Sequence, residues 1–427
     1  MQATSPIISS GLAALVVTFG SGVPAAQADP TDVQRLEARV AELEALVRQL
    51  MDADVATPVA TPAAAPSGPS SSYKFGGYIK ADAIFSDYSA GDLAPGSAGT
   101  QFYIPATIPV GTGGGEGPEA DFQARESRIN FSSKHVTEGG DSLSTFIELD
   151  FFLSPGGDER ISNSYNPRMR HAFIRYNDWT FGQTWSTFQD VVALPDNLDF
   201  IGPSEGTTFV RQDMIRYARG PWEFAVENPE TTITPFGGGA RIVTDDGTLP
   251  DLVARYTAAL DGGYVKAAVL LRRLDYDIAG ASDSDTAYGV TFSGKHSLRG
   301  VDDFRWMATY GSGIGRYLGL NTSNDAVLDA SGELESIDQF GGFVSYRHLW
   351  NDRWRSNLTL SYLSIDNDTA LTGTAVTREV YSAHLNLLFA PAPGLTIGGE
   401  LIYASRELES GLDGDMTRFI FSAKYGF

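Results

Sequence analysis

Basic side chains recur along this chain at positions that share one face of many short segments. Within each segment polar and apolar residues alternate with a period of two, as in β-strands, so residues of equal parity point to the same side. Guanidinium and ammonium groups attract anions, and a guanidinium holds a carboxylate through paired hydrogen bonds. The basic residues on this face are Lys80, Arg128, Arg216, Arg255, Lys266, Arg272, Arg305, Arg347, Arg355, Arg418 and Lys424.

Fewer acidic residues share that face, although the chain carries a formal net charge of -22. They are Asp82, Glu126, Glu148, Asp150, Asp303 and Glu400. The pattern predicts a positively charged face, which suits small anions. The alternative is that some of these arginines pair with neighbouring acids and only rigidify the wall. Arg168, Arg170 and Arg175 occupy both parities of one segment, so alternation does not assign them to a face.

The elements that must position these residues are β-strands, which the alternation predicts from Tyr73 to the end of the chain. Turn residues separate the segments and give sixteen of them. An even number of strands is typical of bacterial outer-membrane barrels. The expected strands are 73–87, 121–136, 141–153, 166–178, 179–186, 207–219, 220–228, 250–260, 262–275, 284–297, 300–312, 337–349, 352–366, 377–391, 393–407 and 414–427.

The connections between these strands alternate between tight turns and long loops. Tight turns such as Asn177-Asp178 and Gly220-Pro221 alternate with polar loops such as 88–120 and 229–249. Short turns on one side and long loops on the other are typical of a transmembrane β-barrel. The last segment fits, because Phe419, Phe421, Tyr425 and Phe427 share one parity and would face lipid. The sequence therefore predicts an all-β, sixteen-stranded antiparallel transmembrane barrel.

Composition agrees with a barrel and excludes several other classes. There is no cysteine and no apolar run long enough for a membrane helix. A mean hydropathy of -0.13 does not exclude a barrel, whose apolar residues alternate with polar ones. The chain has 46 Gly, 6 Trp, 18 Tyr and 24 Phe, which suits tight turns and aromatic girdles. Its acidity argues against a nucleic-acid partner.

The first seventy residues have three different compositions. Residues 1–28 read as a secretory signal peptide that ends at Ala26-Gln27-Ala28, although no Lys or Arg precedes the apolar stretch. Residues 29–51 predict a coiled-coil helix, and residues 52–72 a Pro/Ala/Ser linker before the barrel at 73–427. The seam of this helix consists of Val33, Leu36, Val40, Leu43, Val47 and Leu50. The alternative is a single amphipathic helix that packs on its own chain. Valine at a and leucine at d favour a dimer in isolation.

The loop 187–206, between the fifth and sixth expected strands, is acidic and contains no Lys or Arg. Folded inward, it would narrow a pore and oppose an acidic lip to the basic wall, creating a transverse field. The alternative is an ordinary external loop. Its acidic residues are Asp190, Asp196, Asp199 and Glu205.

Motifs of catalysis or cofactor binding are weak in this sequence. Gly111–Gly117 lacks the Lys-Ser/Thr of a phosphate loop, and the five histidines show no metal spacing. No nucleophile elbow is present. Asp245-Asp246 could bind calcium, but solvated loop charge explains it as well. We therefore expect neither an enzyme nor a cofactor or metal.

Three short motifs resemble the DcaP-like trimeric porin family of Gram-negative outer membranes. They are Phe75–Lys80 in the first strand, Gly182–Phe188 before the acidic loop, and Arg211-Gln212 with Ile215-Arg216-Tyr217 after it. The resemblance implies a homotrimer in outer-membrane lipid with its N-terminal helices in the periplasm. It also implies passive diffusion of small anions, with dicarboxylates as suggested substrates. A general nonspecific porin, or a structural barrel tethered to the periplasmic cell wall, remains the alternative.

Overall fold

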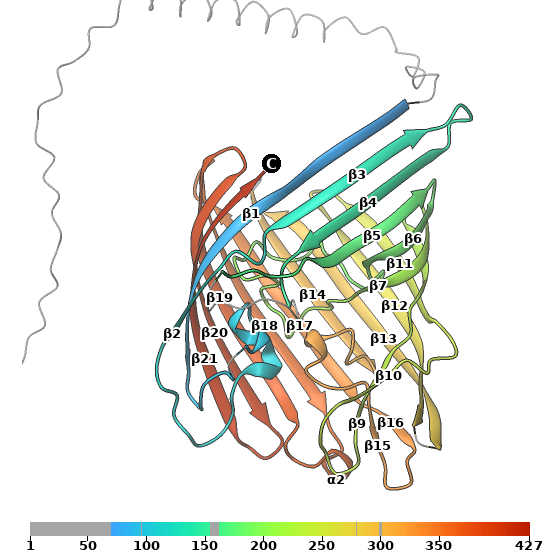
Figure 1. Ribbon diagram of the computed structural model, residues 1–427, viewed down its shortest axis with the longest axis vertical. Coiled ribbons are helices and arrows are strands. Elements are labelled where there is room, and N and C mark those ends of the chain that lie inside the picture. The colour runs from blue at the N-terminus through green and yellow to red at the C-terminus, as the bar shows by residue number, and fades with distance from the viewer. Residues whose placement is uncertain (1–69, 95, 154–161, 279, 299–300) are drawn as a thin grey trace, which may run out of the picture. The chain divides into compact units, whose positions relative to one another are not determined.

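The computed structural model describes residues 70–94, 96–153, 162–278, 280–298 and 301–427 (Figure 1). The expected signal peptide, the heptad helix and most of the linker lie outside the described residues. Within the described part, no helix combines the length and apolar character needed to cross a membrane.

Sixteen antiparallel strands close into a barrel, in which each strand pairs with the next and the last pairs with the first. The short turns lie at the top of Figure 1 and the long loops at the bottom. The strands are β1 (Ser70–Tyr88), β3 (Arg128–Val136), β4 (Ser142–Asp150), β5 (Arg168–Tyr176), β6 (Trp179–Trp185), β7 (Arg211–Arg219), β8 (Trp222–Glu227), β11 (Asp251–Leu260), β12 (Gly263–Ile278), β13 (Ala281–Leu298), β14 (Asp302–Ser312), β17 (Asp338–Leu349), β18 (Trp354–Asp366), β19 (Thr377–Ala392), β20 (Leu395–Leu408) and β21 (Asp413–Gly426). The predicted sixteen-stranded antiparallel barrel is confirmed.

One predicted strand is divided in two. Instead of a continuous strand over 121–136, a short strand β2 (Glu119–Gln123) and β3 pair with successive halves of β1. The ladder passes from Tyr78↔Arg128 to Asp82↔Gln123, so three residues of β1 oppose four of the other strand. Where the ladder is interrupted, the Ser127 hydroxyl takes the place of a main-chain partner. Lys80 N donates to it over 3.1 Å, and it donates to Lys80 O over 3.3 Å.

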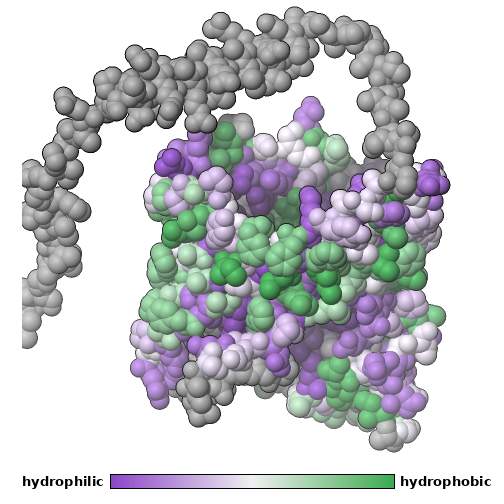
Figure 2. Space-filling model, turned by 45° about the horizontal axis from the view of Figure 1, so that its top comes forward, coloured by the Kyte–Doolittle hydropathy of each residue, from purple (hydrophilic) through white to green (hydrophobic). Residues whose placement is uncertain are grey.

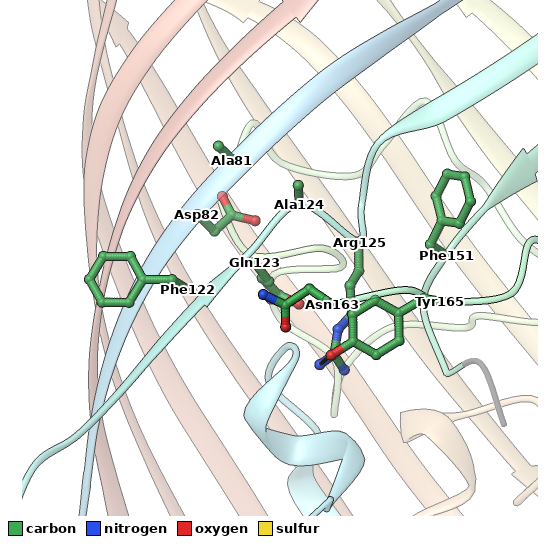
Figure 3. A pocket seen from close by; sticks show the side chains of 9 residues that line it. All are labelled: Ala81, Asp82, Phe122, Gln123, Ala124, Arg125, Phe151, Asn163 and Tyr165. Carbon is green, nitrogen blue, oxygen red and sulfur yellow. Dashed lines mark hydrogen bonds between the residues drawn. The ribbon is translucent and has the colours of Figure 1, made fainter. Parts of the chain in front are cut away.

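A cavity of about 580 Å³ lies beside this interruption, lined by β1, β2 and the segments that follow β2 and β4. The Arg125 guanidinium carbon lies 3.8 Å from the centre of the Tyr165 ring (Figure 3).

The outer wall presents the apolar parity of the strands. Phe419, Phe421, Tyr425 and Phe427 on and after β21 are 43–52% exposed, while their neighbours Arg418, Ile420 and Ser422 are buried. Figure 2 shows hydrophobic side chains gathered on the outer wall of the barrel. A shift of one residue would reverse every face, so the lipid-facing residues fix the register.

Two of the long loops form a second, four-stranded sheet at the long-loop end. It contains β9 (Thr231–Thr234), β10 (Ile242–Thr244), β15 (Ala326–Leu328) and β16 (Leu334–Ser336), and β15 pairs with β9 in parallel. One short helix, α2 (Thr369–Thr372), lies between β18 and β19.

Three loops fold into the barrel and pack there as apolar cores. They are 89–118 with the 3₁₀ turns η1 (Ala98–Thr100) and η2 (Pro105–Thr107), the loop 186–210, and 313–337 with η3 (Gly319–Asn321). Phe188 of the second loop packs with Ile314 and Tyr317 of the third against inward wall residues. Tyr103 and Ile108 of the first loop pack against Leu198 and β20. Part of the barrel interior is therefore filled with side chains.

Candidate functional site

The acidic loop between β6 and β7, residues 186–210, crosses the barrel interior. Asp190 Oδ1 lies 2.7 Å from Lys266 Nζ on β12, and Asp196 Oδ2 lies 2.6 Å from Arg355 Nε on β18. At the middle of the loop, Leu198 O accepts a hydrogen bond of 2.6 Å from Lys80 Nζ on β1. The loop thus spans from one wall to another.

The four acidic residues of this loop have different surroundings. Asp190 also accepts hydrogen bonds from Tyr264 OH and Ser293 Oγ, while Asp199 Oδ2 accepts one of 2.9 Å from the Tyr103 main-chain N. Glu205 is fully buried. Asp190 and Asp196 therefore touch the basic wall directly rather than facing it across a gap.

Basic wall residues also hold the main chain of this loop. Arg255 Nη1 donates to Thr187 O and Gln189 O over 3.1 and 2.8 Å, and Arg305 Nη1 donates to Leu194 O. Arg216 donates from Nε to Thr187 Oγ1 over 2.8 Å and from Nη2 to Trp185 O. These contacts satisfy carbonyl groups that a buried loop would otherwise leave unpaired.

Several of the basic residues expected to line a pore are paired with acids, which is the arrangement that the alternative of a rigidified wall predicts. Lys80 pairs with Glu126, and Arg255 Nε lies 2.6 Å from Glu223 Oε2. Asp303 pairs with both Arg305 and Arg347, and Glu148 lies 3.8 Å from Arg128.

Arg272, in contrast, is a buried support for the third infolded loop. Its side chain has no exposed surface and lies 3.0 Å from Asp251 Oδ2 and 2.8 Å from Asp325 Oδ1. Its Nη1 also donates to Gly313 O over 2.8 Å. Because Asp325 and Gly313 belong to that loop, Arg272 ties it to β12.

Arg418 and Lys424 on β21 make no ion pair with described residues. Arg418 is fully buried and donates to Ser86 Oγ over 2.8 Å and to Gly99 O over 2.6 Å. It thereby holds the first infolded loop. The Lys424 ammonium lies 3.8 Å from the centre of the Tyr78 ring, a cation–π contact.

A β-bulge settles the face of the three arginines on β5. The register of β5 on β4 shifts between Glu148↔His171 and Leu149↔Met169, so one extra residue of β5 is accommodated and the parity reverses. Arg168 pairs across from inward Asp150, and Arg170 is 1% exposed. Arg175, beyond the bulge, lies opposite Ser144, which has the inward parity of Glu148. All three arginines therefore face the interior.

Arg168 and Arg170 belong to a cluster of guanidinium groups that the alternation did not reveal, which we call the arginine cluster: Arg128, Arg168, Arg170 and Arg211. Asp150 lies 2.8 Å from Arg168 and 2.8 Å from Arg170, and Glu148 lies 2.7 Å from Arg170. Two carboxylates thus face four guanidinium groups.

Arg211, the first residue of β7, carries the excess charge of this cluster. Its guanidinium makes no hydrogen bond or ion pair with the described residues, and its Nη1 is buried. It lies 4.9 Å from the centre of the Trp185 ring, with Arg170 and Arg168 as charged neighbours. Arg211 has the parity of outward Ile215, so alternation alone places it outside; its contact with Trp185 at the end of the strand was not detectable from sequence.

Other wall cations gather near the short-turn end, where they outnumber the acids. The cations are Lys80, Arg175, Arg216, Arg255, Lys266, Lys295, Arg305, Arg347, Arg355 and Lys424, and the acids are Asp82, Glu126, Asp190, Asp196, Glu223, Asp303 and Glu400. Among the described residues, no three His, Asp or Glu side chains are placed to hold a metal ion.

Comparison with known proteins identifies the family. Residues 61–427 match the family model described as DcaP outer membrane protein. The chain belongs to the DcaP outer membrane protein family. It is therefore an outer-membrane channel of the porin type in a Gram-negative bacterium, and not an enzyme.

Solved structures share the fold at low sequence identity. The outer membrane channel DcaP of Acinetobacter baumannii has 22% identity and a TM-score of 0.70, covering 85% of this chain and 99% of that one. OmpT of Vibrio cholerae in its trimer form has 11% identity and a TM-score of 0.50, covering 84% and 100%. Salmonella typhi OmpF in complex with daunomycin has 10% identity and a TM-score of 0.51, covering 83% and 97%. No curated protein sequence matches the chain.

Proposed function

We propose that this DcaP-family channel prefers small anions such as dicarboxylates and lets them diffuse down their own gradient. The observation that carries the proposal is Arg211, a guanidinium without an acidic partner beside three other arginines. An excess of positive charge in a partly filled interior raises the local concentration of anions. The cations at the short-turn end extend this attraction along the path.

The balance between attraction and release also favours conduction. Most wall cations are partly neutralised by a carboxylate, so no single position holds an anion at full strength. Conduction requires sites that are favourable enough to enter and weak enough to leave. Guanidinium forks suit carboxylate geometry, which is why dicarboxylates are the proposed solutes.

The decisive measurement is ion selectivity in planar lipid bilayers. We expect a reversal potential in a KCl gradient that reports chloride preference over potassium, and current blocks by added dicarboxylates but not by neutral sugars. Cation preference would overturn the assignment of the basic face. Amino acids complete the solute panel, because a transverse field at the loop would act on zwitterions.

The direct ion pairs favour a second candidate, a general nonspecific porin. Paired charges such as Asp190 with Lys266 cancel much of their field at a distance. A nonspecific porin would show a permeability ratio near unity and equal access for sugars and dicarboxylates of similar size. A barrel acting only as a tether to the cell wall would not conduct.

We further propose that the chain works as a homotrimer, as the trimer form of OmpT does. Conductance would then appear in steps of three. The expected signal peptide 1–28, periplasmic coiled-coil helix 29–51 and linker 52–72 are part of this proposal. Deletion of 29–51 tests the helix: native mass spectrometry would report whether the barrel stays trimeric without it.

A further inference from the structure

Glu205 is a carboxylic acid buried where the acidic loop meets the barrel wall. It has no exposed surface, and neither carboxyl oxygen has a hydrogen-bond partner of normal geometry among the described residues. No Lys or Arg of the described chain lies within ion-pair distance of it. A buried, unpaired carboxylate is costly, so the neutral acid is the form that fits this position.

The groups around Glu205 come from each element that packs against it. Ser361 of β18 and Ser382 of β19 lie beside the carboxyl group, and Tyr103 of the first infolded loop approaches it. Among the described residues, His384 of β19 is the cationic candidate, but its Nδ1 lies 3.3 Å from Glu400 of β20. Asp199 of the same loop adds negative charge nearby and has Arg418 as its own charged neighbour. The surroundings therefore supply no dedicated countercharge to Glu205.

Glu205 sits at the point where two infolded loops are joined. Ser204 Oγ donates to Tyr103 O over 3.0 Å, and Tyr103 N donates to Asp199 Oδ2 over 2.9 Å. Gly206 N donates to Ser361 Oγ over 3.2 Å. These bonds link the loop 186–210 to the loop 89–118 and to β18.

The main chain beside Glu205 is packed tightly against the barrel wall, and the side chain itself has no exposed surface. A Cβ added at the adjacent Gly206 would clash with Gly342 O, so the main chain already touches β17. Because the side chain cannot reach water from this position, ionisation must be relieved by movement of the loop.

We propose that Glu205 is a pH-operated latch that holds the acidic loop in the barrel while protonated and releases it when ionised. The proposal rests on the channel function above, and it concerns regulation of the same constriction. Release of the loop at this point would also loosen the first infolded loop, so the open cross-section would grow.

The direction of the pH effect follows from burial. Burial raises the pKa of the Glu205 carboxyl in the latched state above its ordinary value. At low pH both latched and released states are protonated and the latch holds. As the pH rises above the ordinary range of glutamate, the released state ionises more readily and is favoured. Conductance is therefore expected to rise with pH.

The test compares single-channel conductance of the full chain in planar bilayers between about pH 5 and about pH 9. The wild type is expected to gain conductance by roughly twofold. Glu205→Gln, which is neutral at every pH and of equal size, should keep the low-pH conductance throughout. The matched control Glu335→Gln, an exposed glutamate on β16, should keep the wild-type pH dependence.

A flat wild-type profile, or an undiminished rise in Glu205→Gln, would overturn the latch. Should the Glu205 variant fail to fold, hydrogen exchange of the wild type decides: protection of residues 198–207, corrected for intrinsic rates, must fall at high pH. Unchanged protection would overturn the proposal. The reversal potential, measured in the same bilayers, tests anion preference independently, so failure of either proposal is distinguishable from failure of the other.

Discussion

The Asp196 carboxylate and the Arg355 guanidinium, 159 residues apart in sequence, lie 2.6 Å apart inside the barrel. Their pairing joins the acidic loop to β18 at the middle of its path. The Asp196 main-chain oxygen accepts two more hydrogen bonds of 2.9 Å, from Asn357 and Asn386. The loop is thus fixed there through both its side chain and its backbone.

Asp196→Asn should loosen the loop without unfolding the barrel. The pair is partly exposed, with side chains 32% and 22% accessible, so its loss costs about 1 kcal/mol or less. We expect more frequent brief current fluctuations in single-channel records and an unchanged unfolding temperature. The double variant with Arg355→Gln should fluctuate no more than either single variant; additive effects would mean that the two residues act separately.

Arg211→Gln should weaken anion preference. It removes the one guanidinium of the arginine cluster that has no acidic partner, leaving three arginines against Glu148 and Asp150. We expect the chloride-to-potassium permeability ratio to fall by roughly twofold or more. Arg273→Gln, whose side chain is 45% exposed beside Asp275, is the control and should leave the ratio as it is. An unchanged ratio in Arg211→Gln would remove the main support for an anion site here.

Arg272→Met should destabilise the barrel severely. The substitution would leave Asp251 and Asp325 buried without their shared cation, which costs about 3–5 kcal/mol. The heat-dependent shift in electrophoretic mobility of the folded barrel measures this loss. Arg273→Met, one residue along on the opposite face, should change the transition by much less. Equal effects of the two variants would contradict the supporting role of Arg272.

Single cysteines on β5 test the bulge, because the natural chain contains none. Arg175→Cys should react rapidly with a membrane-impermeant thiol reagent. Ile174 is 48% exposed on the outer face, so Ile174→Cys should be shielded by detergent or lipid. Before the bulge, Arg168→Cys should react rapidly and Met169→Cys should be shielded, so the even-numbered residue faces inward there. Arg168 and Ile174 have the same parity in the sequence, so equal labelling of Arg168→Cys and Ile174→Cys would show that the strand is paired without the extra residue.

The sixteen strands were predictable because the alternation persists through the whole barrel and turn residues interrupt it regularly. The parity also placed Lys80, Arg272 and Arg418 inside. The bulge at Arg170 was not predictable, since an extra residue in one strand leaves no local signal. Nor was the pairing of Asp190 with Lys266, which depends on how a loop folds in three dimensions.

The junction between β1 and β21 gives the barrel an all-or-none assembly. Gly77 N donates to Phe427 O, and Phe427 N donates to Gly77 O, at the end of a ladder that joins the first strand to the last. Until that junction forms, both strands carry a row of unpaired amides and carbonyls that lipid cannot satisfy. An open cylinder is therefore costly in lipid, and formation of this one junction removes both exposed edges at once. The β1–β21 junction therefore separates a complete channel from an incomplete one.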